Sequence, residues 1–185
     1  MTFARLRWPD WVALVAALAL LLVSAADWYS TASAEEARRA EQRAPSSGQG
    51  AEVRSDARAL AESQERNAWQ EDGAIDRVIL LGLLGTVALA IFAAFARAAG
   101  RDYSGRLGPS ASAGLLAAIT ALLVAYRILQ EPGFDSFTTV QAGAPLALLA
   151  LGVIALAAAR AARAEEQGTA FREPAQAGRP AAGHR

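Results

Sequence analysis

Residues 78–96 read VILLGLLGTVALAIFAAFA, a stretch without a single charged side chain. Apolar side chains would cover every face of a helix formed by this stretch, whereas a helix on the surface of a water-soluble protein keeps a polar face. A run of about 20 apolar residues is long enough to cross the hydrocarbon layer of a bilayer as a helix. The stretch therefore predicts a membrane-spanning helix.

Three further runs of the same character lie on either side of it, at residues 11–26, 111–129 and 142–159. Four such runs leave too little polar sequence to cover a water-soluble core. We expect an all-α membrane protein, an antiparallel bundle of four transmembrane helices with a helical extracytoplasmic loop between the first and second spans. With their flanking residues, the predicted spans cover about 11–27, 76–97, 110–129 and 141–162.

Small residues recur at every fourth position of the later spans. Such rows allow the backbones of neighbouring helices in lipid to approach closely, which favours packing along them. We therefore expect these rows to form the contacts between spans. The rows are Gly82, Thr86, Ala90 and Ala94 in the second span, Ala113, Ala117, Ala121 and Ala125 in the third, and Gly143, Ala147, Leu151, Ala155 and Ala159 in the fourth, where Leu151 interrupts the small residues.

The first run has a second interpretation. Two arginines, an apolar stretch and the small residues at 24–26 also fit a cleavable signal peptide. The sequence WPDW at residues 8–11 is a poor boundary for such a peptide, and Trp28 and Tyr29 are typical of an aromatic belt at the membrane surface. We expect residues 1–26 to stay as a span, with the cleaved peptide as the alternative.

The composition argues against several kinds of site. The chain has 185 residues, of which 47 are Ala, and its 18 basic residues, all Arg, balance 18 acidic ones. It has no Cys and one His, His184. Disulfides and thiolate chemistry are therefore excluded, and we expect no metal site and no cofactor. A net charge of zero argues against nucleic acid as a partner.

Arginines at the ends of the spans predict the orientation, because basic residues near span ends favour the cytoplasmic side. The side that would hold both termini carries far more of them than the side with Arg77 and Arg127. We predict a multi-pass protein of the plasma membrane with cytoplasmic N- and C-termini. The arginines on the cytoplasmic side are Arg5, Arg7, Arg97, Arg101, Arg106, Arg160 and Arg163.

The segment between the first two spans, residues 30–72, is the largest polar piece. Ser33 and Glu36 form a capping-box pattern, which predicts a helix near 33–43, a flexible elbow at 45–50 and a second helix near 52–69. This loop has too few large apolar residues to fold alone. It is either a solvated hairpin or a surface that binds a protein partner. Residues 164–185, rich in Gly, Ala, Pro and Arg, predict a disordered cytoplasmic tail.

Charged and aromatic residues gather at the outer ends of the predicted spans. A charge at membrane depth is costly and is normally paired, so Arg127 is expected to pair with Asp76 or Asp27. This group is interpreted either as an ion pair with an aromatic girdle that orders the helices, or as an outward-facing ligand site. Its members are Asp27, Asp76, Arg77, Arg127, Trp69 and Tyr126.

Several of these residues also carry a resemblance. Trp69, Asp76, the pair Tyr126-Arg127 and Pro132, set among the four apolar runs, make residues 8–163 similar to a group of small four-span membrane proteins of actinobacterial type. This chain has Gln130-Glu131-Pro132 where that group would have an acidic residue followed by two prolines, and its first loop is longer. The resemblance implies a topology and a location but no particular activity.

Three functions remain open from the sequence. The first is a non-catalytic membrane protein that acts through residues 30–72 or through its basic inner segments, with a homo-oligomer as a further possibility. The second is a small transporter or channel subunit with a polar site at Asp76 and Arg127, although the middle of the spans offers only Thr86 and Thr120 as polar groups. The third, an intramembrane aspartyl protease using Asp27 and Asp76, has the least support.

Overall fold

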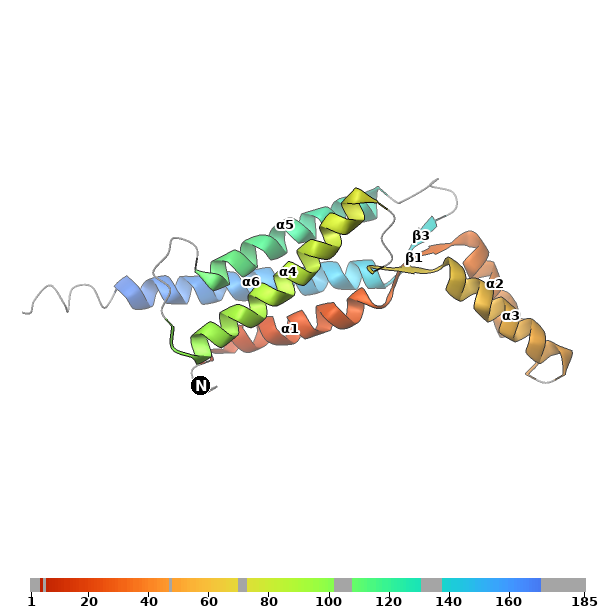
Figure 1. The fold of residues 1–185 in the computed structure, drawn as a ribbon, viewed down its shortest axis with the longest axis horizontal. Coiled ribbons are helices and arrows are strands. Elements are labelled where there is room, and N and C mark those ends of the chain that lie inside the picture. Colours follow the sequence, from red (N-terminus) through yellow and green to blue (C-terminus); the bar gives the residue numbers. More distant parts are fainter. Residues whose placement is uncertain are drawn as a thin grey trace, which may run out of the picture.

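The computed structural model describes residues 4, 6–46, 48–69, 73–101, 108–130 and 138–170. The fold is predominantly helical, and a helical body is joined through a small sheet to a projecting helical hairpin (Figure 1). Pro132 and residues 171–185 of the predicted tail lie outside the described residues. The elements in order are α1 Trp8–Ser24, β1 Asp27–Thr31, α2 Ala32–Arg43, α3 Gln49–Gln64, β2 Arg66–Asn67, α4 Ala74–Ala98, α5 Pro109–Leu129, β3 Thr138–Val140 and α6 Gly143–Ala170.

Helices α1, α4, α5 and α6 form the helical body. Three of them, α4, α5 and α6, are long and apolar enough to cross a membrane. Helix α1 is equally apolar but has 17 residues, which gives a length of about 26 Å at 1.5 Å per residue. It ends at Ser24, three residues before the predicted boundary at 27, and this difference changes the surroundings of Asp27.

The two ends of the helical body are defined by contacts between distant residues. At the amino end, the start of α1 lies beside the end of α4, where Asp10 pairs with Arg97, and beside the end of α6, where Arg7 Nη1 donates to the carbonyl of Ala164 at 3.3 Å. At the sheet end, the start of α4 meets the end of α5.

The buried side chains of α5 are spaced alternately three and four residues apart. In α5 the buried series continues from Ala117 to Thr120 and Val124, leaving the predicted row of every fourth residue. An alternating spacing follows the 3.6-residue helical turn more closely than a strict repeat of four, so the contact stays on one face. The row predicted on α5 is therefore correct only in its first half, whereas Thr86, Ala90 and Ala94 of the row predicted on α4 are all buried. The core includes Ala16, Ala17, Leu20, Leu83, Val87, Ala90, Ala117, Val124, Ala147, Leu151 and Ile154.

A three-stranded sheet at the sheet end was not expected from the sequence. Strand β1 lies in the middle and pairs antiparallel with β2 on one side and β3 on the other. Trp28, expected in an interfacial belt, is instead 3% exposed, and its indole Nε1 donates to the carbonyl of Val23 at 3.1 Å. Gly143 allows this packing, because a Cβ there would lie 2.5 Å from Trp28 Cδ1 and from the carbonyl oxygen of Asp27.

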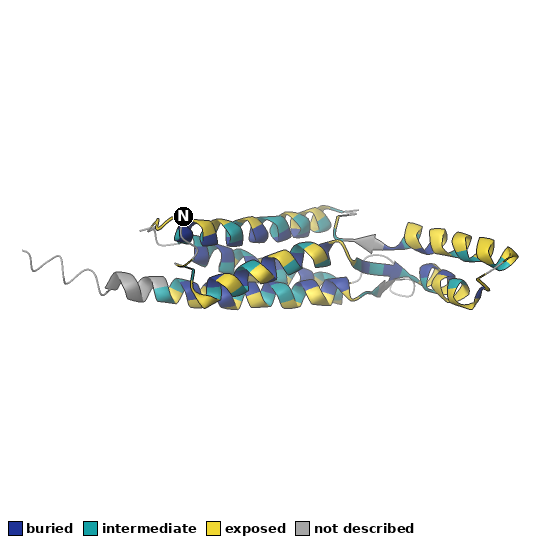
Figure 2. Ribbon diagram, turned by 90° about the horizontal axis from the view of Figure 1, so that it is seen from below, coloured by how far each residue is buried: buried dark blue, intermediate teal, exposed yellow. Residues whose placement is uncertain are grey.

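Helices α2 and α3 pack against each other as a hairpin that projects beyond the sheet, and most of its residues are exposed (Figure 2). The predicted helices near 33–43 and 52–69 are present, although the second begins and ends earlier than expected. The N-cap of α2 is Thr31, whose Oγ1 accepts from the amide of Ala34 at 3.2 Å, so the capping position predicted at Ser33 is wrong by two residues. The buried residues of the two helices are Ala34 and Ala37 in α2 and Ala61 in α3.

Candidate functional site

Asp76 and Arg127 meet at the sheet end of the helical body. Asp76 lies in the first turn of α4 and Arg127 in the last turn of α5. Arg127 Nε donates to Asp76 Oδ1 and Arg127 Nη2 to Asp76 Oδ2, each at 2.8 Å. The Arg127 side chain is 18% exposed and the Asp76 side chain is 21% exposed. The structure thus brings together two of the six predicted site residues in a bidentate pair.

This pairing accounts for the charges on both residues. The positive end of a helix dipole favours Asp76 at the start of α4, and the negative end favours Arg127 at the end of α5. A two-point guanidinium–carboxylate contact is also among the strongest pairings of protein side chains, and it fixes the orientation of both groups. The arrangement is suited to fixing the position of α4 relative to α5, because two parallel hydrogen bonds join a residue of one helix to a residue of the other.

Asp27 contacts the hairpin rather than the Asp76–Arg127 pair. It lies at the start of β1, where Arg38 Nη2 approaches its Oδ2 at 3.3 Å. Burial raises the pKa of the Asp27 carboxyl above its usual value of 3.8, the negative charge of Glu65 raises the pKa further, and Arg38 opposes the rise. The expectation that Asp27 could be a partner of Arg127 is therefore wrong, because the chain leaves α1 at Ser24 and enters the sheet.

Arg38 and Glu65 hold the base of the hairpin to the sheet, and sequence reasoning missed this pair. Arg38 uses Nε and Nη2 on the two carboxylate oxygens of Glu65, with 2.6 Å from Nη2 to Oε2. The Glu65 side chain is almost fully buried. The hydrogen bond to Glu65 raises the pKa of the Arg38 guanidinium. The spacing of α2 gave no signal for this pair, because Arg38 and Arg39 follow Glu35 by three and four residues and both lie on its side of the helix.

The three remaining predicted site residues also lie at this end of the helical body. Arg77 follows Asp76 on α4 and is exposed. Trp69, in the turn after β2, and Tyr126, on α5, are each about half exposed. Their positions fit an aromatic girdle around the sheet end, which was one of the two interpretations of this group.

A second polar node lies at the amino end and also escaped the sequence analysis. Asp10 is 5% exposed; its Oδ2 accepts from the amide of Arg7 at 2.8 Å, and its Oδ1 pairs with Arg97 Nη1. Arg97 Nη2 donates to Ser110 Oγ at 2.6 Å. Helices α1, α4 and α5 are thus tied together by one guanidinium. The sequence analysis used Arg97 only to predict the orientation in the membrane. Asp10 near the start of α1 and Arg97 near the end of α4 carry opposite charges at neighbouring helix ends, and this pattern predicts a pair here as it does for Asp76 and Arg127.

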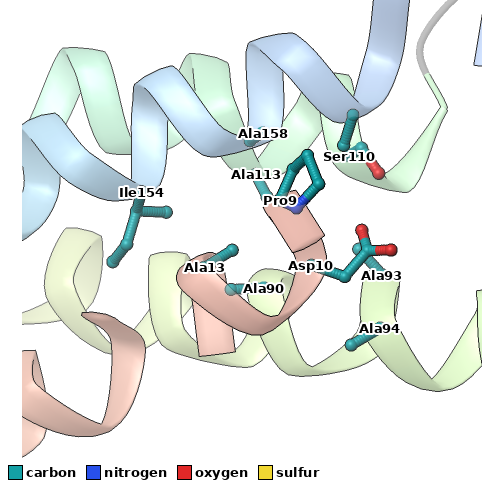
Figure 3. A pocket seen from close by; sticks show the side chains of 11 residues that line it. Pro9, Asp10, Ala13, Ala90, Ala93, Ala94, Ser110, Ala113, Ile154 and Ala158 are labelled. Atoms are coloured by element: carbon teal, nitrogen blue, oxygen red, sulfur yellow. The ribbon is translucent and has the colours of Figure 1, made fainter. Parts of the chain in front are cut away.

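A small hollow adjoins this node and is lined by residues of all four helices of the body (Figure 3). The Asp10 carboxylate and Ser110 are its polar walls, and most of the remaining lining is alanine. The hollow has room for about one water molecule. It is too small for an organic ligand, which normally needs a pocket of several hundred cubic ångströms.

The described residues give no support to the proposed protease chemistry. The proposed chemistry requires the carboxyl groups of Asp27 and Asp76 to share a proton, whereas Asp27 contacts Arg38 and Glu65 and Asp76 contacts Arg127. Within the described part of the chain, no three His, Cys, Asp or Glu residues are grouped so that they could hold a metal ion. Comparison of the chain with models of known protein families, with curated proteins and with solved structures found no match.

Proposed function

We propose that this chain is a non-catalytic integral membrane protein that anchors the α2–α3 hairpin to the plasma membrane and presents it to a protein partner outside the cell. The observation that carries the proposal is the division of the fold into an apolar helical body and an exposed polar hairpin on a short sheet (Figures 1 and 2). Such a shape separates the part that needs lipid from the part that reaches into water.

The apolar surface of the helical body supports the membrane placement. Large apolar side chains point outward along all four helices, and together they form a surface that a water-soluble monomer would not expose. Lipid is the partner whose chemistry fits a surface of this kind. Examples, each more than half exposed, are Leu18, Leu22, Leu81, Leu122, Leu149 and Leu156.

Contacts at the helix ends support four spans that alternate in direction. Asp76 pairs with Arg127 at one end of α4 and α5, and Arg97 reaches Ser110 at the other, as expected for antiparallel neighbours. Arg7 reaches the Ala164 carbonyl from the start of α1, which favours opposite directions for α1 and α6. We propose that α1 is the fourth span and that the amino end faces the cytoplasm, because exposed arginines gather there.

The chemistry of the helical body favours an anchor over a transporter. A transport site near the bilayer midplane normally contains ionisable or well-hydrated groups. In the described residues of this body, the buried polar side chains between the two ends are Thr86 and Thr120, which are 0% and 1% exposed and packed among apolar residues. The similarity to four-span proteins of actinobacterial type remains part of this proposal.

The hairpin carries the features expected of a docking surface for protein. Val53 and Leu60 are about half exposed and stand seven residues apart on α3, which places them on the same side of the helix. Charged residues surround them, including the Arg58–Glu62 pair, where Nε lies 2.8 Å from Oε1. A partner helix with a matching apolar stripe would cover both side chains.

A photocrosslinking amino acid at Leu60 tests the proposal in intact cells. We expect one dominant crosslinked protein, and we expect the same substitution at Leu122, on the lipid-facing side of α5, to give none. Reporter fusions after residues 50 and 175 measure topology in parallel and should report outside and inside. Identical crosslinking patterns from Leu60 and Leu122 would show that the hairpin does not select a partner.

A further inference from the structure

Three exposed arginines come together at the amino end, where α1 meets α6. Arg7 stands at the N-cap of α1 and reaches the Ala164 carbonyl on α6. Arg160 lies one helical turn before Ala164, and Arg163 directly precedes it. All three side chains are exposed. We call these three residues the arginine corner.

The positive charge of this corner is not compensated within the described side chains. The carboxylate described at this end is Asp10, which is buried and already pairs with Arg97. The ion pairs among the described side chains include none from the three corner arginines. Like charges on neighbouring helix ends repel one another, and a bound anion relieves that repulsion.

An aromatic side chain stands at the same corner. Trp8 directly follows Arg7 and is 79% exposed, and Trp11, one turn further along α1, is 45% exposed. Tryptophan favours the boundary between lipid tails and headgroups, because its ring is apolar and its N–H can donate a hydrogen bond. The corner therefore combines guanidinium groups, which match phosphate geometry, with a side chain that locates it at headgroup level.

We propose that Arg7, Arg160 and Arg163 form a binding surface for the phosphate headgroup of an anionic phospholipid. The proposal rests on the membrane placement proposed above. A phosphodiester would accept hydrogen bonds from guanidinium groups on both helices and would neutralise their repulsion. Bound lipid would then hold the end of α6 against the start of α1.

Quenching of tryptophan fluorescence by brominated lipids tests the proposal on the full chain in vesicles. The probe lipids are brominated phosphatidylglycerol and brominated phosphatidylcholine, each diluted into unlabelled phosphatidylcholine. We expect the wild-type chain to prefer the anionic lipid by roughly fivefold or more, since each arginine near a membrane surface contributes about that factor. We expect the variant R7Q/R160Q/R163Q to lose the preference.

A variant with the same loss of charge on the hairpin, R39Q/R43Q/R58Q, is the matched control and should keep the preference. Retention of the preference in R7Q/R160Q/R163Q would overturn the proposal. Loss of the preference on adding inorganic phosphate, compared with sodium chloride of equal ionic strength, would assign the corner to free phosphate and overturn it as well.

The same experiment separates this proposal from the membrane placement on which it rests. Quenching by brominated phosphatidylcholine without any preference for the anionic lipid would overturn the arginine corner alone. Absence of quenching by both lipids would overturn the corner and the membrane placement together, because Trp8 and Trp11 are exposed and would then contact no acyl chain.

Discussion

Arg127 donates hydrogen bonds to both carboxylate oxygens of Asp76, at 2.8 Å from Nε to Oδ1 and 2.8 Å from Nη2 to Oδ2. The contact joins the last turn of α5 to the first turn of α4. Because both side chains are largely withdrawn from solvent, water and salt screen the pair less than they would screen an exposed pair. We therefore expect this pair to contribute to stability.

Arg127→Ala should lower the free energy of unfolding of the detergent-solubilised protein by about 1.5–3 kcal/mol, because it leaves the Asp76 carboxylate without its charged donor. Denaturation followed by circular dichroism measures the change. Arg101→Ala removes an exposed arginine at the amino end, and it should change stability by less than about 0.5 kcal/mol. Equal effects of the two substitutions would mean that the Arg127 guanidinium extends into water and that its pair with Asp76 adds no stability.

The polar node at the amino end should depend on the shape of the arginine as well as its charge. Arg97→Lys keeps the charge but cannot reach Asp10 and Ser110 with one planar group. We expect it to cost about 1 kcal/mol, and Arg97→Ala to cost about 3 kcal/mol, because the latter leaves buried Asp10 without its charged partner. Thermal unfolding in detergent measures the stability of both variants. If Arg97→Lys is as stable as the wild type, the Arg97 guanidinium does not tie α1, α4 and α5 together.

The apolar helices could be predicted from the sequence because the length of a hydrophobic run is a local property. The Asp76–Arg127 contact was also predictable, since opposite charges stand at facing ends of consecutive predicted spans. The sheet could not be predicted in this way. Its strands have two to five residues, too few for a periodic pattern, and β1 pairs Asp27 with Asn67 and Tyr29 with Val140, far apart in the sequence.

The misplacement of Asp27 has a physical cause of the same kind. The apolar run continues to residue 26, so hydropathy extended the first span to 27, whereas the helix ends at Ser24. The pairing of β1 with β2 and β3 supplies hydrogen bonds that the last residues of a longer helix would lack. Tertiary pairing thus decided where α1 ends, and it turned Asp27 toward Arg38.

Gly82 should be intolerant of a side chain. A Cβ at this position would lie 2.5 Å from Thr120 Oγ1 and 3.0 Å from Thr120 Cγ2, across the contact between α4 and α5. We expect Gly82→Ala to lower the free energy of unfolding by about 1–3 kcal/mol, because overpacking forces the helices apart. Gly152→Ala is the matched control in α6, where a Cβ would meet nothing within 4 Å, and it should not destabilise.

A second substitution tests whether the clash with Thr120 is the cause. Thr120→Ala removes the two closest atoms, so the double variant Gly82→Ala, Thr120→Ala should recover most of the stability lost by Gly82→Ala alone. Denaturation of the four chains in the same detergent gives the coupling energy between the two sites. Strict additivity would show that the loss comes from another source.

Asp27 gives the base of the hairpin a pH dependence whose sign follows from its surroundings. Burial raises the pKa of its carboxyl above 3.8 in the folded chain, with repulsion from Glu65 adding to the rise. At a pH between the unfolded-state pKa and the raised folded-state pKa, folding is therefore accompanied by uptake of a proton on the Asp27 carboxyl. The cost of the buried charge is present at every pH above the folded-state pKa and is relieved as the pH falls through that value toward 3.8.

Asp27→Asn should slow amide hydrogen exchange in β1 and α2 at about pH 7, because the neutral amide carries no burial cost for a charge and does not repel Glu65. The difference from wild type should shrink as the pH is lowered toward the raised pKa of the Asp27 carboxyl, where the wild-type group takes up a proton. Glu65→Gln is the opposing variant, since it removes the charge that Arg38 holds with two nitrogens, and it should speed exchange throughout this range. Faster exchange in Asp27→Asn at neutral pH would mean that attraction to Arg38 outweighs burial and the repulsion by Glu65.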